Sequence, residues 1–353
     1  MTMVGARLNI LAPAATALIL LGSIACDRHS PPSDQVRLVE RTHMTMGSEL
    51  RVSVWAADDA GASSATDAVF SEFDRLDALM SVWKDGSDIQ RLNAAAGEVA
   101  VPVSPEVREV LRVAHEVSDW TGGKFDVTFG ALSGLWKFDQ DQNNRIPDRE
   151  DVLKQLPLVD YRRLKIDDEA GTAFLERKGM RAHLGGIGKG YAVDRAVAIL
   201  RRRGFNDFIV QAGGDMYVSG RRGDRPWRVA IRDPRGPEDR SFAALDLTDG
   251  SFSTSGDYER FFMKDGRRYH HILDPDRGEP ATLCRSVTIV ADNATLADAL
   301  STGVFVVGPD EGMKLVERLP HVEGVIVSAK NEVLISSGLR GRLMLLAPPT
   351  DAP

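Results

Sequence analysis

The order of the strand-like and helix-like stretches is the feature of this sequence that most constrains its fold. Residues 49–55, "ELRVSVW", alternate apolar and polar side chains as a half-buried strand does. The stretch "DFIVQAGGDMYVSG" predicts two strands joined by a turn at Gly213-Gly214, and further β-rich runs follow in "WRVAIRDP", "SFAALDL" and "SVTIVA". Because strands and helices do not alternate strictly, we expect α+β layers rather than a doubly wound parallel sheet.

Four helices are predicted among these strands. Residues 65–80 carry apolar side chains at helical spacing, and Pro105 suits the first turn of a second helix with its own apolar stripe. Two more are expected at residues 189–203 and 294–306. At 353 residues and 43% hydrophobic content the chain can bury a full core, and its net charge of −7 argues against a nucleic-acid partner.

The N-terminus resembles an export signal that ends in a lipid-attachment site. Arg7 precedes an apolar stretch, and Ser23-Ile24-Ala25-Cys26 resembles a bacterial lipobox, whose cysteine is acylated. The alternative is an uncleaved anchor, for which the apolar stretch is short. We therefore predict a lipoprotein signal at residues 1–25, a lipidated Cys26 with a tether at 26–40, and one catalytic domain at 41–348. Asp27 resembles the signal that keeps such proteins at the inner membrane, so a periplasmic location is expected.

Cysteine content limits the covalent chemistry of the exported chain. Once Cys26 is acylated only Cys284 remains, so no intrachain disulfide can form even in an oxidising compartment. We expect Cys284 to pack as a small hydrophobe.

A glycine-rich run, "LGGIGKGYAVD" at residues 184–194, precedes one of the predicted helices. A turn of this kind at a helix N-terminus offers backbone N–H donors to an anion, and Lys189 adds a full positive charge. The spacing matches neither a P-loop nor a dinucleotide-binding fingerprint. A tight strand-to-helix connection is the alternative explanation.

Asp298 and Thr302 lie one helical turn apart in "TLADALSTGVF", so their oxygens project from one face. Carboxylate and hydroxyl oxygens suit Mg²⁺, which completes its shell with phosphate oxygens of a substrate. The structural alternative has Thr302 bonding back to the carbonyl of residue 298 and Asp298 capping the helix or pairing with an arginine.

His271 and Asp274 lie three residues apart in "YHHILDP", beside Pro275. An imidazole at such a turn can act as a general base near neutral pH, although a plain surface turn has the same pattern. The sequence contains neither a zinc-binding H-E-x-x-H nor the G-x-S-x-G of serine hydrolases.

Taken in order, these segments resemble the ApbE family of FAD:protein FMN transferases. The resemblance extends from "MGS" through "LMSVWKDGSDIQRLN", "TGGKFDVTFGALSGLW", "LGGIGKGYAVD", "AGGDMYVSG", "STSGDYER" and "HHILDPDRG" to "ADALST". It implies a T-fold-like α+β domain and a periplasmic, Mg²⁺-dependent enzyme that splits FAD, attaches FMN to a threonine of another protein and releases AMP. Acceptors would be flavin-carrying subunits of membrane redox complexes, such as ion-pumping quinone reductases or Rnf-type complexes.

The resemblance also assigns roles to individual residues. The residues implied to contact FAD are Met46, Trp83, Lys124, Phe125, Asp126, His183, Lys189 and Ile272. Mg²⁺ would be held by the carbonyl of Gly186 and by the side chains of Asp298 and Thr302. The base that takes the threonine proton would be His271 or a carboxylate such as Asp257.

Two positions depart from the family pattern. His183 stands where the family usually has aspartate, and an imidazole cannot simply replace a carboxylate acceptor. Thr295 stands where some members carry an additional acidic metal ligand. Two rival functions also remain: an FAD pyrophosphatase that yields FMN and AMP, and a lipoprotein that only binds flavin.

Overall fold

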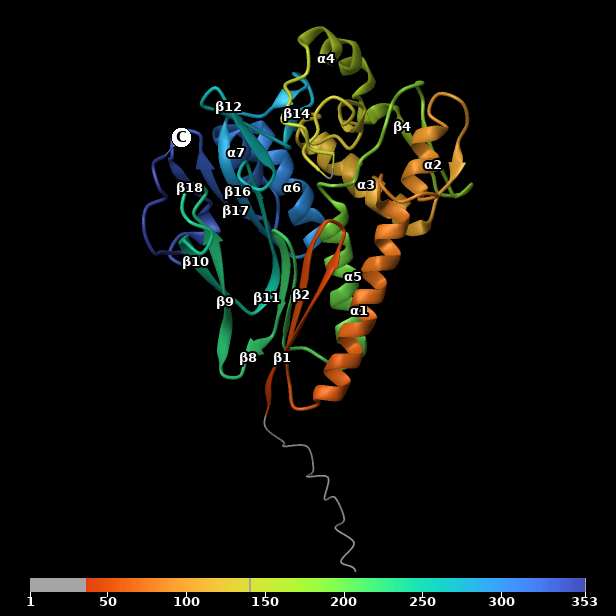
Figure 1. Ribbon diagram of the computed structural model, residues 1–353. Helices are drawn as coiled ribbons and strands as arrows, with labels where there is room; N and C mark the ends of the chain where they lie inside the picture. The colour runs from red at the N-terminus through yellow and green to blue at the C-terminus, as the bar shows by residue number, and fades with distance from the viewer. Residues whose placement is uncertain (1–35, 140, 353) are drawn as a thin grey trace, which may run out of the picture. The chain divides into compact units, whose positions relative to one another are not determined.

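The computed structural model describes residues 36–139 and 141–352, and these form one compact unit, Gln35–Pro353 in extent. Cys26 and the predicted signal lie outside the described residues. Within the described part, no helix combines the length and the apolar character that a bilayer crossing requires. The predicted α+β fold is confirmed (Figure 1), and its strands pair in antiparallel sheets.

An eight-stranded antiparallel sheet forms the centre of the unit, in the order β1-β2-β6-β7-β11-β16-β17-β18. Its strands are β1 (Arg37–Thr45), β2 (Ser48–Ala56), β6 (Phe208–Ala212), β7 (Asp215–Ser219), β11 (Asp249–Gly256), β16 (Cys284–Ala291), β17 (Glu323–Ser328) and β18 (Val333–Ile335). Short turns join β1 to β2, β6 to β7 and β17 to β18, as antiparallel pairing allows, whereas the other neighbouring strands are linked by longer segments. Residues 37–40, assigned to the tether from sequence, already belong to β1 and pair with β2.

The described residues form the helices α1 (Asp59–Met80), α2 (Asp88–Ala94), α3 (Pro105–Trp120), α4 (Arg149–Gln155), α5 (Gly188–Arg202), α6 (Ala294–Val307) and α7 (Pro309–Arg318). Of these, α1, α5, α6 and α7 pack on the eight-stranded sheet and cover one of its faces. The ribbon shows α1 and α5 side by side (Figure 1), and α6 packs on α5, β11 and β16. The four helices predicted from sequence are therefore confirmed, with ends shifted by up to six residues.

A second, smaller sheet covers the other face, in the order β19-β10-β9-β8. The remaining strands form a three-stranded sheet, β3-β5-β4, and the two pairs β12–β13 and β14–β15. The bounds of these strands are β3 (Val101–Pro102), β4 (Leu164–Asp167), β5 (Thr172–Leu175), β8 (Arg221–Arg222), β9 (Arg225–Arg232), β10 (Ser241–Leu247), β12 (Phe261–Lys264), β13 (Arg267–His270), β14 (Leu273–Asp274), β15 (Glu279–Pro280) and β19 (Met344–Leu345).

Strand alternation divides the core into two main layers. Leu50, Val52 and Val54 point from β2 toward the helices and are fully buried, as their period-2 spacing predicts. On β11, Phe252 packs toward the β9–β10 side, so the neighbouring Ser253 and Ser255 face α6. Cys284 is buried as expected, and burial raises the pKa of its thiol to about 12.

Candidate active site

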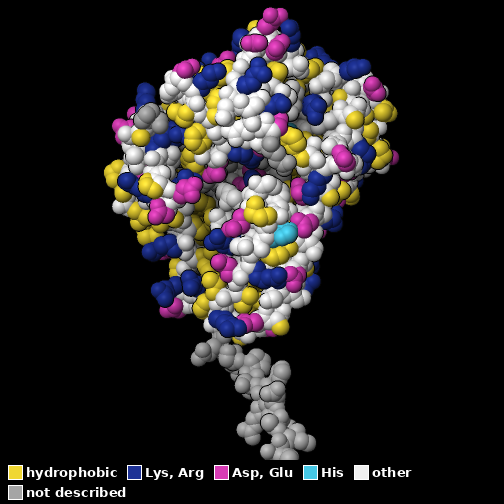
Figure 2. Space-filling model, viewed as in Figure 1, with side chains coloured by type: hydrophobic (Ala, Val, Ile, Leu, Met, Phe, Trp, Pro, Cys, Tyr) yellow, Lys and Arg dark blue, Asp and Glu magenta, His cyan; other side chains and the backbone are white. Residues whose placement is uncertain are grey.

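A cleft with two connected lobes lies where the loop before α5 meets α6 and the end of β11. The first lobe, of about 330 Å³, contains Lys124, His271, Asp298 and Thr302 in its wall. The second, of about 550 Å³, is lined by Met46, the 80–84 segment and the 183–189 segment. The surface is visibly hollowed near the middle of the face in Figure 2, and both acidic and basic side chains line the hollow.

Three charged side chains meet at the floor of the cleft. Lys189 lies in the first turn of α5, and its Nζ contacts Asp215 Oδ2 on β7 at 2.5 Å and Asp298 Oδ2 on α6 at 3.9 Å. Asp215 and Asp298 are almost fully buried. When both carboxyl groups are ionised, the group carries one positive and two negative charges, an excess of −1 in a poorly solvated place.

Burial and the neighbouring charges shift the pKa values of both Asp298 and Lys189. Burial and the nearby Asp215 raise the pKa of Asp298 to about 7, although Lys189 and the N–H of Gly190 act in the opposite direction. Burial lowers the pKa of Lys189, but Asp215 and Asp298 more than offset this effect and raise it above its usual value. A buried carboxylate of this kind favours a further cation nearby.

The residues expected to hold Mg²⁺ lie together. Thr302 comes one turn after Asp298 on the same face of α6, and a side chain added at Gly186 would lie 3.3 Å from Thr302 Oγ1. The backbone of Gly186 can therefore approach the hydroxyl closely. One carboxylate, one hydroxyl and one carbonyl beside an uncompensated negative charge fit a hard cation. In the described part of the chain no three His, Cys, Asp or Glu side chains form a metal cluster, so the fit depends on this smaller set.

The structural alternative for α6 holds only in part: Asp298 does accept from an N–H in the first turn of α5, but Thr302 does not bond back along its own helix. Thr302 Oγ1 bonds to Ser255 Oγ at 3.0 Å rather than to the carbonyl of residue 298, which instead accepts from Ser301. The hydroxyls of Ser253, Ser255 and Ser301 continue from Thr302 as far as Asp215 Oδ1. A line of hydroxyl groups thus connects the predicted metal ligand to the counter-ion of Lys189.

The glycine run before α5 has two separate structural roles. At Gly186 the missing side chain leaves room beside Thr302, whereas at Gly190 a Cβ would lie 2.2 Å from the carbonyl oxygen of Ala294, so glycine there permits α5 and α6 to pack. The N–H of Gly190 donates to Asp298 Oδ2 at 2.9 Å, and that of Gly188 donates to the Leu184 carbonyl. Because both N–H groups already have partners within the protein, the expectation that the glycine run presents them to a bound anion is wrong for Gly188 and Gly190.

Helix α6 is tied to α5 at its start as well. Asp194, at the end of the glycine-rich run, accepts hydrogen bonds from the N–H groups of Ala294 and Thr295 and from the Thr295 hydroxyl at 2.5 Å. The Thr295 hydroxyl is thus engaged by Asp194. This cap fixes the helix that carries Asp298.

His271 lies in the wall of the first lobe, directly after β13. Its N–H donates to the Arg260 carbonyl at 3.1 Å, and its Nδ1 is buried without a hydrogen-bond partner among the described residues. Burial and the charge of Arg260 hold the pKa of the imidazole well below its usual value, so the ring is neutral at pH 7. A neutral imidazole is the form that can accept a proton. Ile272 is buried beside it and also lines the lobe.

Asp257, the other candidate base, is not at the cleft. Both of its oxygens accept from the Arg235 guanidinium at 2.7 Å, and both side chains are about 8% exposed. It is absent from the lining of either lobe. A carboxylate held in a buried bidentate ion pair cannot take a proton from an incoming hydroxyl, so the prediction for Asp257 is wrong.

The "TGGKFDV" segment, residues 121–127, lines the first lobe. Lys124 bridges Asp274 at 2.8 Å and Asp276 at 2.9 Å, so its charge is already shared between two carboxylates. Phe125 packs in the core at the edge of the lobe. Asp126 accepts from the backbone and hydroxyl of Thr128 and from a second backbone N–H; burial raises its pKa to about 6. The carboxyl of Asp126 is therefore occupied in holding this turn together. Only its position in the wall of the first lobe supports the predicted contact with FAD.

Met46 and Trp83 line the second lobe. Met46 occupies the two-residue turn between β1 and β2 with φ of +49°, followed by Gly47 at +70°. Both values suit a type I′ hairpin turn, in which methionine is an unusual first residue. Trp83 is 48% exposed and its side chain faces the second lobe, where a ring system could stack on it.

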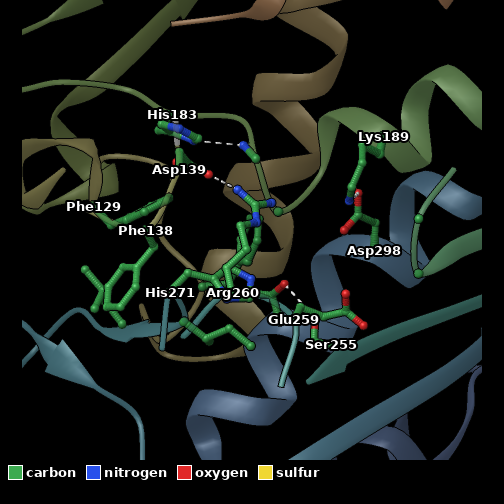
Figure 3. Close-up of a pocket in the computed structure, with 18 of the residues that line it drawn as sticks. Phe129, Phe138, Asp139, His183, Lys189, Ser255, Glu259, Arg260, His271 and Asp298 are labelled. Carbon is green, nitrogen blue, oxygen red and sulfur yellow. Dashed lines mark hydrogen bonds and ion pairs between the residues drawn. The ribbon is translucent and has the colours of Figure 1, made fainter. Parts of the chain in front are cut away.

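His183, which departs from the family pattern, lies between the two lobes and lines both. Its Nδ1 accepts from the N–H of Gly185 at 3.0 Å, and its ring lies 5.3 Å from that of Phe129. Burial lowers the pKa of this imidazole; Asp139 opposes the shift and Arg260 adds to it. Figure 3 shows His183, Asp139 and Arg260 grouped on one side of the pocket, and Lys189 with Asp298 on the other.

Sequence reasoning missed Asp215, Asp139 and Arg260. Asp215 and Arg260 belong to the blocks "AGGDMYVSG" and "STSGDYER", which were recognised without a role for these residues. Asp139 has no such signal, since only the fold brings it to the cleft.

Comparisons with known proteins agree with this arrangement. A model of the ApbE family matches residues 46–326. Proteins described as FAD:protein FMN transferases are 33% identical over 279 residues in Klebsiella pneumoniae (78% of this chain, 80% of that protein) and 32% over 330 residues in Treponema pallidum (88% and 90%).

Solved structures give the same result. The crystal structure of an ApbE protein from Thermotoga maritima aligns with a TM-score of 0.80 at 33% identity, over 87% of this chain and 99% of that one. A flavin transferase ApbE from Vibrio cholerae aligns with a TM-score of 0.78 at 25% identity, over 87% and 100%. With a family model that covers most of its length and relatives of this similarity, the chain belongs to the ApbE family.

Proposed function

We propose that this protein is an FAD:protein FMN transferase, which moves the FMN part of FAD to a threonine hydroxyl of a flavoprotein and releases AMP. The observation that carries the proposal is the buried group of Lys189, Asp215 and Asp298 at the floor of a two-lobed cleft. Relatives at about one-third identity over most of the chain bear the same description. A dinucleotide with two ring systems and a central diphosphate matches two lobes with charged groups at their junction.

We propose Mg²⁺ as the metal, held by the Gly186 carbonyl, Asp298 and Thr302. When bound, Mg²⁺ would neutralise diphosphate charge and make the FMN phosphorus more electrophilic. The excess negative charge at Asp298 and the space beside Gly186 support this assignment.

The chain's own residues orient the diphosphate and move the proton. Lys189 presents its ammonium to a phosphate oxygen while Asp215 keeps it in place. The threonine oxygen attacks the FMN phosphorus, the bond from that phosphorus to the AMP phosphate oxygen breaks, and AMP leaves with the electron pair. Neutral His271 accepts the threonine proton through a ring nitrogen. The phosphoester forms without a covalent enzyme intermediate.

The acceptor and the location complete the proposal. We propose acylation of Cys26, anchoring at the periplasmic side of the inner membrane, and acceptors among flavin-carrying subunits of membrane redox complexes. The lipobox-like sequence before Asp27 supports this, since a tethered enzyme and a membrane-bound acceptor would share one surface.

Product analysis separates this function from its two rivals. The purified protein is incubated with FAD and Mg²⁺, with and without a candidate acceptor, and nucleotides are separated by chromatography. A transferase releases AMP only when the acceptor is present and releases no free FMN. Equal FMN and AMP without acceptor would establish a pyrophosphatase instead, and intact FAD in every sample would leave flavin binding as the function.

A further inference from the structure

Arg260 is the second cation at the junction of the two lobes, and the mechanism above gives it no role. Seven residues line both lobes: Gly47, Phe138, Asp139, His183, Gly185, Lys189 and Arg260. Among them only Lys189 and Arg260 carry a permanent positive charge. Because a dinucleotide with one ring system in each lobe must place its diphosphate at this junction, both cations are within its surroundings.

We propose that Arg260 binds the diphosphate of FAD, and that Asp139 holds its guanidinium until FAD arrives. This inference rests on the proposed function, because it takes FAD as the ligand of the cleft. Arg260 then acts from the side opposite Lys189 and Asp298, as their positions in Figure 3 indicate.

The two cations differ in how deeply their carboxylate partners are buried, and this difference explains why Arg260, rather than Lys189, can leave its partner for a phosphate. Lys189 is bound to Asp215, which is only 3% exposed, so separating that pair would strand a buried charge. Arg260 pairs with Asp139, and their side chains are 43% and 27% exposed. An exposed ion pair is weak and easily replaced. The planar guanidinium also matches two phosphate oxygens at once, which an ammonium does not.

The backbone keeps Arg260 beside the reacting groups. Its carbonyl accepts from the N–H of His271 at 3.1 Å, so the two residues are fixed relative to each other. In the absence of ligand, burial first and then the Arg260 charge lower the pKa of His271. A phosphate that takes up the guanidinium would remove part of that effect at the moment when the base is needed.

Binding measurements without any acceptor test the inference. Titration calorimetry of Arg260→Ala should give about 10- to 100-fold weaker binding of FAD and of ADP, as expected for a lost charge-assisted contact, with riboflavin affinity unchanged. Arg260→Lys should recover part of the loss. Asp139→Asn should bind FAD as tightly as the wild type or more tightly, because the competing carboxylate is gone.

Two nearby residues supply matched controls. Arg267 lies on β13 and Asp141 pairs with Lys137, and neither lines the cleft; Arg267→Ala and Asp141→Asn should leave all three affinities unchanged. Melting temperatures confirm that each variant is folded.

If the ion pair were merely structural, replacing either partner would weaken FAD binding, whereas we expect only the loss of Arg260 to weaken it. The inference is overturned if Asp139→Asn weakens FAD binding as Arg260→Ala does, if Arg260→Ala leaves FAD and ADP affinity intact, or if it weakens riboflavin equally. A wild-type protein that does not bind FAD would instead overturn the proposed function.

Discussion

Replacement of Asp298 by asparagine should stabilise the metal-free protein above neutral pH. In the wild type, one lysine and two carboxylates share a buried position, so one negative charge is uncompensated. Asp298→Asn keeps the volume and leaves Lys189 paired with Asp215. The folded state therefore loses an unfavourable charge rather than a favourable ion pair.

The pKa of Asp298 gives the size and the pH range of the effect. A carboxyl that titrates at 3.8 when unfolded and at about 7 when folded keeps its proton longer in the folded state. The contribution of this carboxyl to wild-type stability is therefore fully present below pH 4, is lost as the pH rises through about 7, and does not change further once Asp298 is ionised in both states. At ~1.4 kcal/mol per pKa unit the cost is about 2 kcal/mol at pH 5 and about 4 kcal/mol at pH 8. The difference between the variant and the wild type should widen over that interval.

Urea unfolding measures this difference directly. Both proteins are unfolded at pH 5 and pH 8 in EDTA, and again with excess Mg²⁺, which should stabilise only the wild type. Asp292→Asn, at an exposed position two residues before α6, is the matched control and should show no pH-dependent difference. A variant that is less stable than the wild type at pH 8 in EDTA, or a gap that does not change with pH, would refute the reasoning.

Four further predictions concern the cleft and the anchor. Trp83→Ala should weaken FAD binding by about 0.5–1.5 kcal/mol with little change in stability, since the ring is half exposed; unchanged affinity by titration removes it from the site. Met46→Asn should leave the melting temperature nearly unchanged, because relief of about 1 kcal/mol of backbone strain offsets lost packing, yet FAD affinity should fall; an intact affinity argues against a flavin contact. His271→Ala should retain FAD binding and lose acceptor-dependent AMP release, and full activity would exclude His271 as the base. Cys26→Ser, which lies outside the described residues, should abolish fatty-acid labelling and membrane retention; a native protein without a lipid contradicts the anchor.

Local sequence patterns correctly predicted which side chains are buried, or share a face, within a single helix or strand. Leu50, Val52 and Val54 alternate in sequence and are all buried on one face of β2. The Pro105 helix buries its predicted stripe in the same way. The spacing of Asp298 and Thr302 correctly placed both oxygens on one face of α6 and in one cleft.

The same patterns could not predict contacts between residues that are remote in sequence, because such contacts depend on how the whole chain folds. Asp257 lies in a recognised block beside residues of the cleft, yet its carboxylate pairs with Arg235, twenty-two positions away in sequence. Asp139 and Arg260 meet only because their loops fold toward one another. The glycine run was expected to offer N–H donors to an anion, whereas glycine at position 190 is needed because the backbone of α6 lies against it. In each case a partner that is remote in sequence decides the role of the residue.

The most direct test of transfer is the mass of the acceptor peptide. The protein is incubated with FAD, Mg²⁺ and a candidate flavoprotein subunit, and the acceptor is digested and analysed by tandem mass spectrometry alongside the AMP released. We predict FMN on a threonine in amounts equal to AMP, and neither product when that threonine is replaced by alanine. Release of AMP with free FMN and an unmodified acceptor would contradict the central claim that this cleft delivers FMN to a protein.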